Sequence, residues 1–141
     1  GSPAMAATAA VANSYKQECY DGIHAAADVY KIALYVAANA TLSAATTAYT
    51  VTGEVTGTGY TAGGLTLAGR ASGLSTNTAY ETWTSPQWTS ATITADTAVI
   101  YNSSKANRIV CVLTFASTSS TNGTFTVNLP AAGATATVTN T

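Results

Sequence analysis

Almost all of the chain after Asp28 consists of short segments in which apolar and polar residues alternate, separated by turn signals. The segment 29–36, for example, puts Tyr30, Ile32 and Leu34 on one face, because successive side chains of a strand point to opposite sides. Turns recur about every 8–12 residues, a spacing typical of antiparallel sandwiches and barrels. The sequence therefore predicts an all-β fold, mainly an antiparallel, jelly-roll-like β-sandwich of roughly seven to nine strands, with one short N-terminal helix.

One run stands out because it is apolar on both faces. Residues 108–115 read Arg-Ile-Val-Cys-Val-Leu-Thr-Phe, the pattern of a central strand covered on both sides. Asn122-Gly123 is a strong hairpin turn signal. The remaining expected strands are 29–36, 65–72, two short strands on either side of Ser85-Pro86, 92–102, 125–129 and 135–138.

The only helical pattern lies near the start of the chain. Residues 13–27 are expected to form a helix capped by Asn13 or Ser14, with Gln17 completing a capping box with Ser14. We expect one domain over residues 14–141, preceded by a flexible segment over residues 1–13. That segment opens with Gly-Ser-Pro-Ala-Met, which resembles a cloning remnant, and continues as an alanine-rich arm.

The chain has few groups that could perform chemistry. It contains six carboxylates and one histidine, and charged residues make up 8% of it, against about 25% in typical domains. Enzymes bring acids, bases or nucleophiles together in one pocket, so we expect no enzymatic activity and no catalytic residues. Threonine and alanine each make up about a fifth of the sequence. Such a neutral, hydroxyl-rich exterior offers little electrostatic repulsion and suits a subunit packed against neighbours.

Two features suggest a binding site but lack the necessary context. The glycine-dense stretch 54–64 has no GK[ST] ending and opens no helix, so we interpret it as a structural turn rather than a phosphate loop. His24 is expected at the helix end, within reach of Asp21, but it has no nearby set of metal ligands. We therefore expect no cofactor and no metal site.

Charge and hydropathy also limit the partners. The net charge is −1 and the basic residues are scattered, so we expect no nucleic-acid binding. Lys105 and Arg108 lie close together, in what we interpret as a solvated turn. No apolar run approaches the ~20 residues that span a bilayer, so we expect no membrane partner. Cys19 and Cys111 are expected to be reduced and packed.

Trp83 and Trp88 allow two interpretations. Exposed, they would form a platform for carbohydrate stacking or receptor binding; buried, they would anchor the core. Their position around Ser85-Pro86, before a long alternating strand, favours burial. Three glycosylation sequons are interpreted as chance matches in a threonine-rich chain, at Asn39, Asn102 and Asn122.

The order of several motifs resembles that of a family of small structural proteins encoded in the virion gene clusters of tailed bacteriophages. The resemblance covers roughly residues 14–130, with one departure in the alanine-rich segment 22–28. It is carried by Lys31-Ile32-Ala33-Leu34-Tyr35, Thr47-Ala48-Tyr49, Glu54-Val55-x-Gly57-Thr58-Gly59-Tyr60-Thr61-Ala62-Gly63-Gly64, Trp88-Thr89-x-Ala91-Thr92-Ile93-Thr94-Ala95, Ala98-Val99-Ile100-Tyr101-Asn102 and Asn122-Gly123-x-Phe125-Thr126-Val127.

This resemblance implies a virion component assembled in the bacterial host cytoplasm, above all a capsid decoration (cement) subunit that binds the assembled head lattice. Its partners would be the major capsid protein, or neck or tail proteins, and further copies of itself. Candidate contacts are the N-terminal arm and the loops 37–47 and 56–64. The alternatives are a neck or tail component, or a receptor- or glycan-binding module of a tail tip. A secreted surface or pilus-like domain is a third interpretation, disfavoured because no signal peptide is evident.

Overall fold

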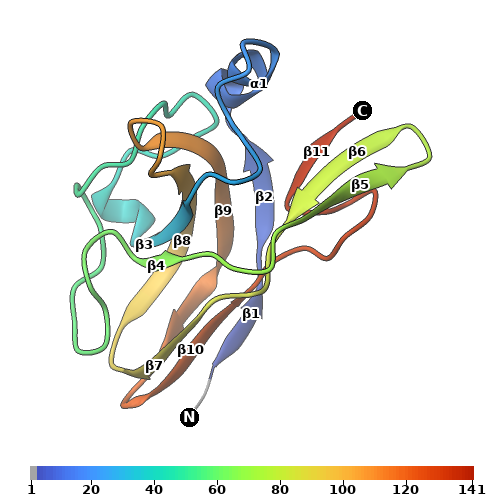
Figure 1. Cartoon of the computed structure of the whole chain (residues 1–141). Coiled ribbons are helices and arrows are strands. Elements are labelled where there is room, and N and C mark those ends of the chain that lie inside the picture. Colours follow the sequence, from blue (N-terminus) through green and yellow to red (C-terminus); the bar gives the residue numbers. More distant parts are fainter. Residues whose placement is uncertain (1–2) are drawn as a thin grey trace.

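The structure is a computed structural model that describes residues 3–141; Gly1 and Ser2, the first two residues of the expected cloning remnant, lie outside the described residues. The described part is mainly β, with one α-helix, as the sequence predicts (Figure 1). The helices are α1 (Asn13–Tyr20) and the 3₁₀-helix η1 (Ala37–Asn39). The strands are β1 (Ala4–Ala6), β2 (Thr8–Val11), β3 (Tyr30–Tyr35), β4 (Leu65–Thr66), β5 (Ala71–Ser75), β6 (Thr78–Thr82), β7 (Gln87–Ala91), β8 (Thr94–Asn102), β9 (Arg108–Ser119), β10 (Gly123–Asn128) and β11 (Val138–Asn140).

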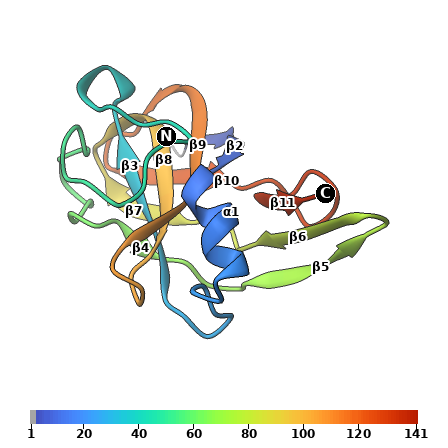
Figure 2. The same cartoon turned by 90° about the horizontal axis from the view of Figure 1, so that it is seen from above.

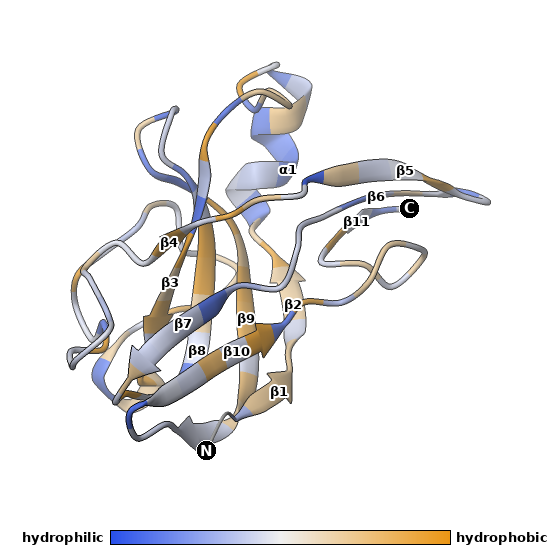
Figure 3. Cartoon of the chain, turned by 60° about the horizontal axis from the view of Figure 1, so that its bottom comes forward, coloured by the Kyte–Doolittle hydropathy of each residue, from blue (hydrophilic) through white to orange (hydrophobic). Residues whose placement is uncertain are grey.

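These strands form three sheets. The largest has the order β2-β9-β8-β3-β4, and a smaller one has the order β1-β10-β7. The two lie against each other as layers, with the apolar strands β3, β8 and β9 behind β7 and β10 (Figure 3). Trp88 and Phe125 from the smaller sheet meet edge to face, 6.3 Å apart, within the shared core. All pairings are antiparallel except that of β1 with β10.

The larger sheet is buried on both faces at its centre. Residues 109–113 of β9 are all buried, which confirms the expected central strand. The layer of β1, β10 and β7 covers one face. The loop between η1 and β4 covers the other, where Tyr49 stacks on Tyr101 with ring centroids 4.7 Å apart. Tyr35 donates a hydrogen bond to the carbonyl of Thr50 in the same loop.

The expectation of a flexible arm over residues 1–13 is wrong for residues 4–11. Strand β1 pairs in parallel with β10, and β2 pairs in antiparallel register with β9, so this one segment crosses from the smaller sheet to the larger (Figure 1). Ala7, between the two strands, is buried, as is Ala12, and the Ala12 N–H donates to the carbonyl of Val110 at 2.9 Å. The small side chains of Ala7 and Ala12 allow this segment to pack closely where it joins the two sheets.

Helix α1 is shorter than the expected 13–27. It ends in a Schellman motif: the Ile23 N–H donates to the carbonyl of Glu18, and the Gly22 N–H donates to that of Cys19. Gly22 has φ +69°, a left-handed conformation that glycine adopts without a steric penalty. The expected cap is also wrong, because Ala12 occupies the N-cap position and no side chain caps the helix.

The third sheet has the order β11-β6-β5 and projects sideways from the sandwich (Figures 1 and 2). The hairpin of β5 and β6 was not predicted, because residues 71–82 combine small and polar side chains without clear alternation. Helix α1 lies beside this sheet, and a cavity lies between them.

Candidate functional site

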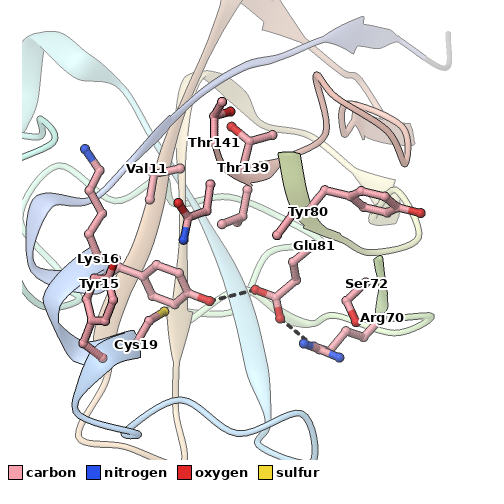
Figure 4. Close-up of a pocket in the computed structure, with 14 residues that line it drawn as sticks. Val11, Tyr15, Lys16, Cys19, Arg70, Ser72, Tyr80, Glu81, Thr139 and Thr141 are labelled. Carbon is pink, nitrogen blue, oxygen red and sulfur yellow. Dashed lines mark hydrogen bonds and ion pairs between the residues drawn. The ribbon is translucent and has the colours of Figure 1, made fainter. Parts of the chain in front are cut away.

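The cavity of about 560 Å³ lies between α1 and the projecting sheet (Figure 4). Its size falls within the range typical of ligand pockets. Helix α1 contributes Tyr15, Lys16, Cys19 and Tyr20, and β2 contributes Val11. The opposite wall consists of Arg70, Ser72, Ala79, Tyr80, Glu81 and residues 138–141.

Glu81 is the centre of this cavity. Its side chain is 8% exposed, and Tyr15 and Arg70 approach it from opposite sides (Figure 4). The Tyr15 hydroxyl donates to Glu81 Oε1 at 2.8 Å, and Arg70 Nε donates to Oε2 at 2.5 Å. A buried carboxylate is costly unless it is paired and hydrogen-bonded, so these two contacts are what allow Glu81 to be buried. They also join α1 to the third sheet.

Tyr15 and Cys19, which line the cavity with Glu81, both have raised pKa values. Burial, and then the negative charge of Glu81, raise the pKa of the Tyr15 hydroxyl well above its usual range. Desolvation also raises the pKa of the Cys19 thiol. A nucleophilic cysteine needs a lowered pKa, so the cavity wall does not activate this thiol. The arrangement is that of a structural ion pair.

A second polar cluster lies where the chain leaves α1. His24 contacts Glu18 rather than the expected Asp21: Nε2 lies 2.9 Å from Glu18 Oε1, and Asn102 Nδ2 donates to Nδ1 at 3.0 Å. The imidazole is 2% exposed and packs on Tyr15 with ring centroids 4.6 Å apart. The histidine therefore fixes the segment after the helix to β8.

The same cluster contains Lys105 and Arg108, which the sequence places in a solvated turn. Their side chains are 36% and 38% exposed there, and each also pairs with a carboxylate: Lys105 Nζ with Asp28 Oδ2 at 2.8 Å, and Arg108 Nε with Glu18 Oε2 at 3.3 Å. Asn102 donates to Asp28 as well, and these hydrogen bonds lower the pKa of Asp28 to about 2. These side chains are cross-links between the helix region and the β8–β9 turn.

The glycine-dense stretch 54–64 is a structural loop built around Glu54. This carboxylate accepts hydrogen bonds from the hydroxyls of Tyr49 and Tyr60 and from the Gly63 N–H at 2.8 Å. Gly64 approaches the backbone of β3 so closely that a Cβ there would lie 1.7 Å from the Ile32 carbonyl oxygen. The close approach explains why glycine is needed at this position.

Trp83 and Trp88 are buried, with 5% and 2% of their surface exposed. Trp83 packs against Tyr30 at 5.4 Å between ring centroids, and Trp88 against Tyr60 at 6.1 Å. The core-anchor interpretation is therefore confirmed. Cys111 is buried and Cys19 is exposed, and both are free thiols, so the expectation of packing is wrong for Cys19.

No pattern in the sequence indicates the cavity. Tyr15 lies 66 residues from Glu81 in the chain, and Arg70 and Glu81 meet only because the unpredicted hairpin folds back on itself. The one available signal was Glu81 itself, a lone carboxylate in an almost uncharged stretch.

Within residues 3–141 no group of three or more His, Cys, Asp or Glu side chains could hold a metal ion. None of the helices described there is long and apolar enough to cross a membrane. No protein-family model, curated protein or solved structure matches the chain. Its function must therefore be argued from its own residues.

Proposed function

We propose that this chain is a non-enzymatic structural subunit of a tailed-bacteriophage virion, with a capsid decoration protein as the preferred role. It would bind the assembled head lattice and stabilise it by mass action, because a ligand that binds only the assembled state shifts the equilibrium toward it. Many copies with weak individual contacts would add through avidity. The motif order described above suggests the virion; the following observations support a role in contact.

The observation that carries the proposal is how the fold uses its carboxylates. Five of the six accept hydrogen bonds inside the fold, where they join loops and helix to the sheets: Glu18, Asp28, Glu54, Glu81 and Asp96. Groups that could act as acids or bases are thereby committed to holding the shape. The surface that remains is rich in small hydroxyl side chains, as in the hollow lined by residues 92–94 and 119–121.

The buried tryptophans favour this role over the receptor- or glycan-binding alternative. Carbohydrate platforms use exposed aromatic faces, and neither Trp83 nor Trp88 offers one. A neck or tail location fits the same surface properties, so location is what the experiment must decide.

The test is electron microscopy of the virion whose genome encodes this chain, with a gold-labelled antibody raised against it. Mass spectrometry of the purified, nuclease-treated particles should detect the chain. Label spread over the head would support decoration, whereas label confined to one vertex or to the tail would replace it with the neck or tail role. Absence of the chain from the particles would refute the proposal altogether.

A further inference from the structure

The edge of the projecting sheet is open. Strand β5 pairs with β6 on one side and with no other strand among residues 3–141, and it is the outermost strand in Figure 2. Residues 71–74 are all exposed, and Leu74 keeps 72% of its surface. Natural proteins protect such edges with charges, prolines, bulges or covering loops. The sequence Ala-Ser-Gly-Leu-Ser contains no charge and no proline, and the β5–β6 register is regular.

The other edge strands are short or lie against other segments. Strands β1, β4 and β11 have two or three residues each, and β2 contacts β11. The glycine-rich loop lies against the end of β7, since a Cβ on Gly59 would lie 2.7 Å from the Ala91 Cα. At five residues, β5 is the longer of the two outer strands of the third sheet.

The hairpin geometry defines which backbone groups are unpaired. Ser75 pairs with Thr78 across a two-residue turn, so the hydrogen-bonded pairs of this hairpin involve Ser75, Gly73 and Ala71. The alternation of an antiparallel ladder then turns the N–H and C=O groups of Ser72 and Leu74 toward the open side. This edge offers two donors and two acceptors at a two-residue spacing.

A second copy of the same strand satisfies all four groups. If two β5 strands pair antiparallel about a two-fold axis at Gly73, Ser72 lies opposite Leu74 of the other copy, and both pairs exchange their hydrogen bonds. The two Gly73 residues then form the close pair at the axis, where no side chain is present to clash. Tyr80 already covers Gly73 within its own sheet, since a Cβ there would lie 2.7 Å from the Tyr80 hydroxyl.

Charge also permits this pairing. Along the strand, the nearest charged residue is Arg70, which would lie opposite Thr76 of the other copy, and Glu81 on the neighbouring strand is paired with Arg70. No like charges therefore lie opposite each other across the axis. The net charge of −1 adds almost no repulsion between copies. We propose that β5 is a self-association edge, through which two copies of this chain join their three-stranded sheets into one continuous six-stranded sheet. This inference stands on the hairpin alone and does not depend on a role in the virion.

The contact is small. A single strand pair buries far less than the roughly 1,200 Å² of the smallest stable interfaces, so purified protein should dimerise only at high concentration. A register-specific cross-link is therefore the appropriate test. Ala71 and Ser75 of the partner form the next close pair, with Cα atoms about 4.5 Å apart, within the range of a disulfide.

The experiment uses two variants, Ala71→Cys and Ser75→Cys, each in a Cys19→Ser background to remove the exposed native thiol. One of them carries a mass tag. Mixed at high concentration and mildly oxidised, they should give the mixed disulfide dimer in large excess. Each variant alone should give little dimer, because in this register two copies of the same cysteine are four residues apart along the strands.

Ser72→Pro is the control variant that should disrupt pairing between two copies of β5 without unfolding the hairpin. Proline at this position removes an N–H that faces the open side and leaves the β6 ladder intact, so unfolding should change little while the mixed dimer is lost. Three outcomes would overturn the proposal: no mixed dimer, equal dimer from the single variants, or a mixed dimer that survives Ser72→Pro in a folded protein. The assay uses purified protein, so its failure is distinct from absence of the chain from virions.

Discussion

Replacing Gly64 by alanine should destabilise the protein strongly, for two separable reasons. Gly64 has φ +79°, which costs a residue with a side chain about 1–2 kcal/mol. In addition, the new Cβ would lie 1.7 Å from the Ile32 carbonyl oxygen and 2.9 Å from the Ala33 Cα, both in the centre of β3. The loop must move away from the strand, at an overpacking cost of about 1–3 kcal/mol. We expect a total loss of about 2–5 kcal/mol.

Gly22→Ala is the matched control. Gly22 has a similar φ of +69°, but a Cβ there would meet no atom within 4 Å, so only the conformational cost of about 1–2 kcal/mol applies. Urea titration followed by tryptophan fluorescence measures both changes, since Trp83 and Trp88 are buried. In thermal scans, 1 kcal/mol should correspond to about 3 °C for a chain of this length. Equal losses for the two variants would refute the inference that the loop lies against the β3 backbone.

Four further predictions follow from single features. Glu81→Ala should lower the free energy of unfolding, measured by urea titration, by about 2 kcal/mol. The loss is smaller than for a fully buried ion pair, because Arg70 is 29% exposed and water can solvate it again. An unchanged free energy would mean that Glu81 does not hold α1 to the third sheet. The pKa of Asp28 in the folded protein is about 2, below its ordinary value of 3.8. The ionised carboxylate therefore contributes fully to the free energy of unfolding above pH ~4, and this contribution is lost as the pH falls toward 2. Asp28→Asn should therefore lose less stability than the wild type over that range, and parallel acid titrations would contradict the ion pair. Cys111→Asp should prevent folding, because it buries an unpaired charge in a residue with no exposed surface, whereas Cys111→Ser should fold; circular dichroism distinguishes them. Deleting residues 3–11 should lower the thermal midpoint by several degrees, since it removes two paired strands, and an unchanged midpoint would restore the flexible-arm interpretation.

The sandwich strands could be predicted because their signals are local. Alternation in 29–36 and the two-sided apolar run of β9 need no partner to be recognised. The prediction for the N-terminal strands was wrong because their signals are not local. Residues 4–11 are mostly alanine, which has low strand propensity, and they form strands only because the edges of β9 and β10 supply ladders to complete. The conformation of such a segment is set by the strands that it pairs with rather than by its own propensity.

The candidate site depended even more on contacts remote in sequence. The setting of the tryptophans indicates the core, but helical spacing alone places Asp21, rather than Glu18, within reach of His24. The helix stops at Tyr20, because Gly22 reverses the chain, and the reversal brings His24 back over Glu18. Likewise the turn that holds Lys105 and Arg108 is partly solvated as expected, but their carboxylate partners, Asp28 and Glu18, lie too far away in the chain for the sequence to indicate the ion pairs.

Eight of the eleven charged side chains form hydrogen bonds or ion pairs within the fold. These bonds join separate parts of the chain: Glu81 of β6 pairs with Arg70, just before β5, and Asp28 pairs with Lys105 in the β8–β9 turn. The β5 edge has no such ion pair and no charge to repel a neighbour. Edges of this kind are normally selected against because they promote association. For the proposed role in association, the same lack of protection would be an advantage, and the β5 edge is the first contact to test.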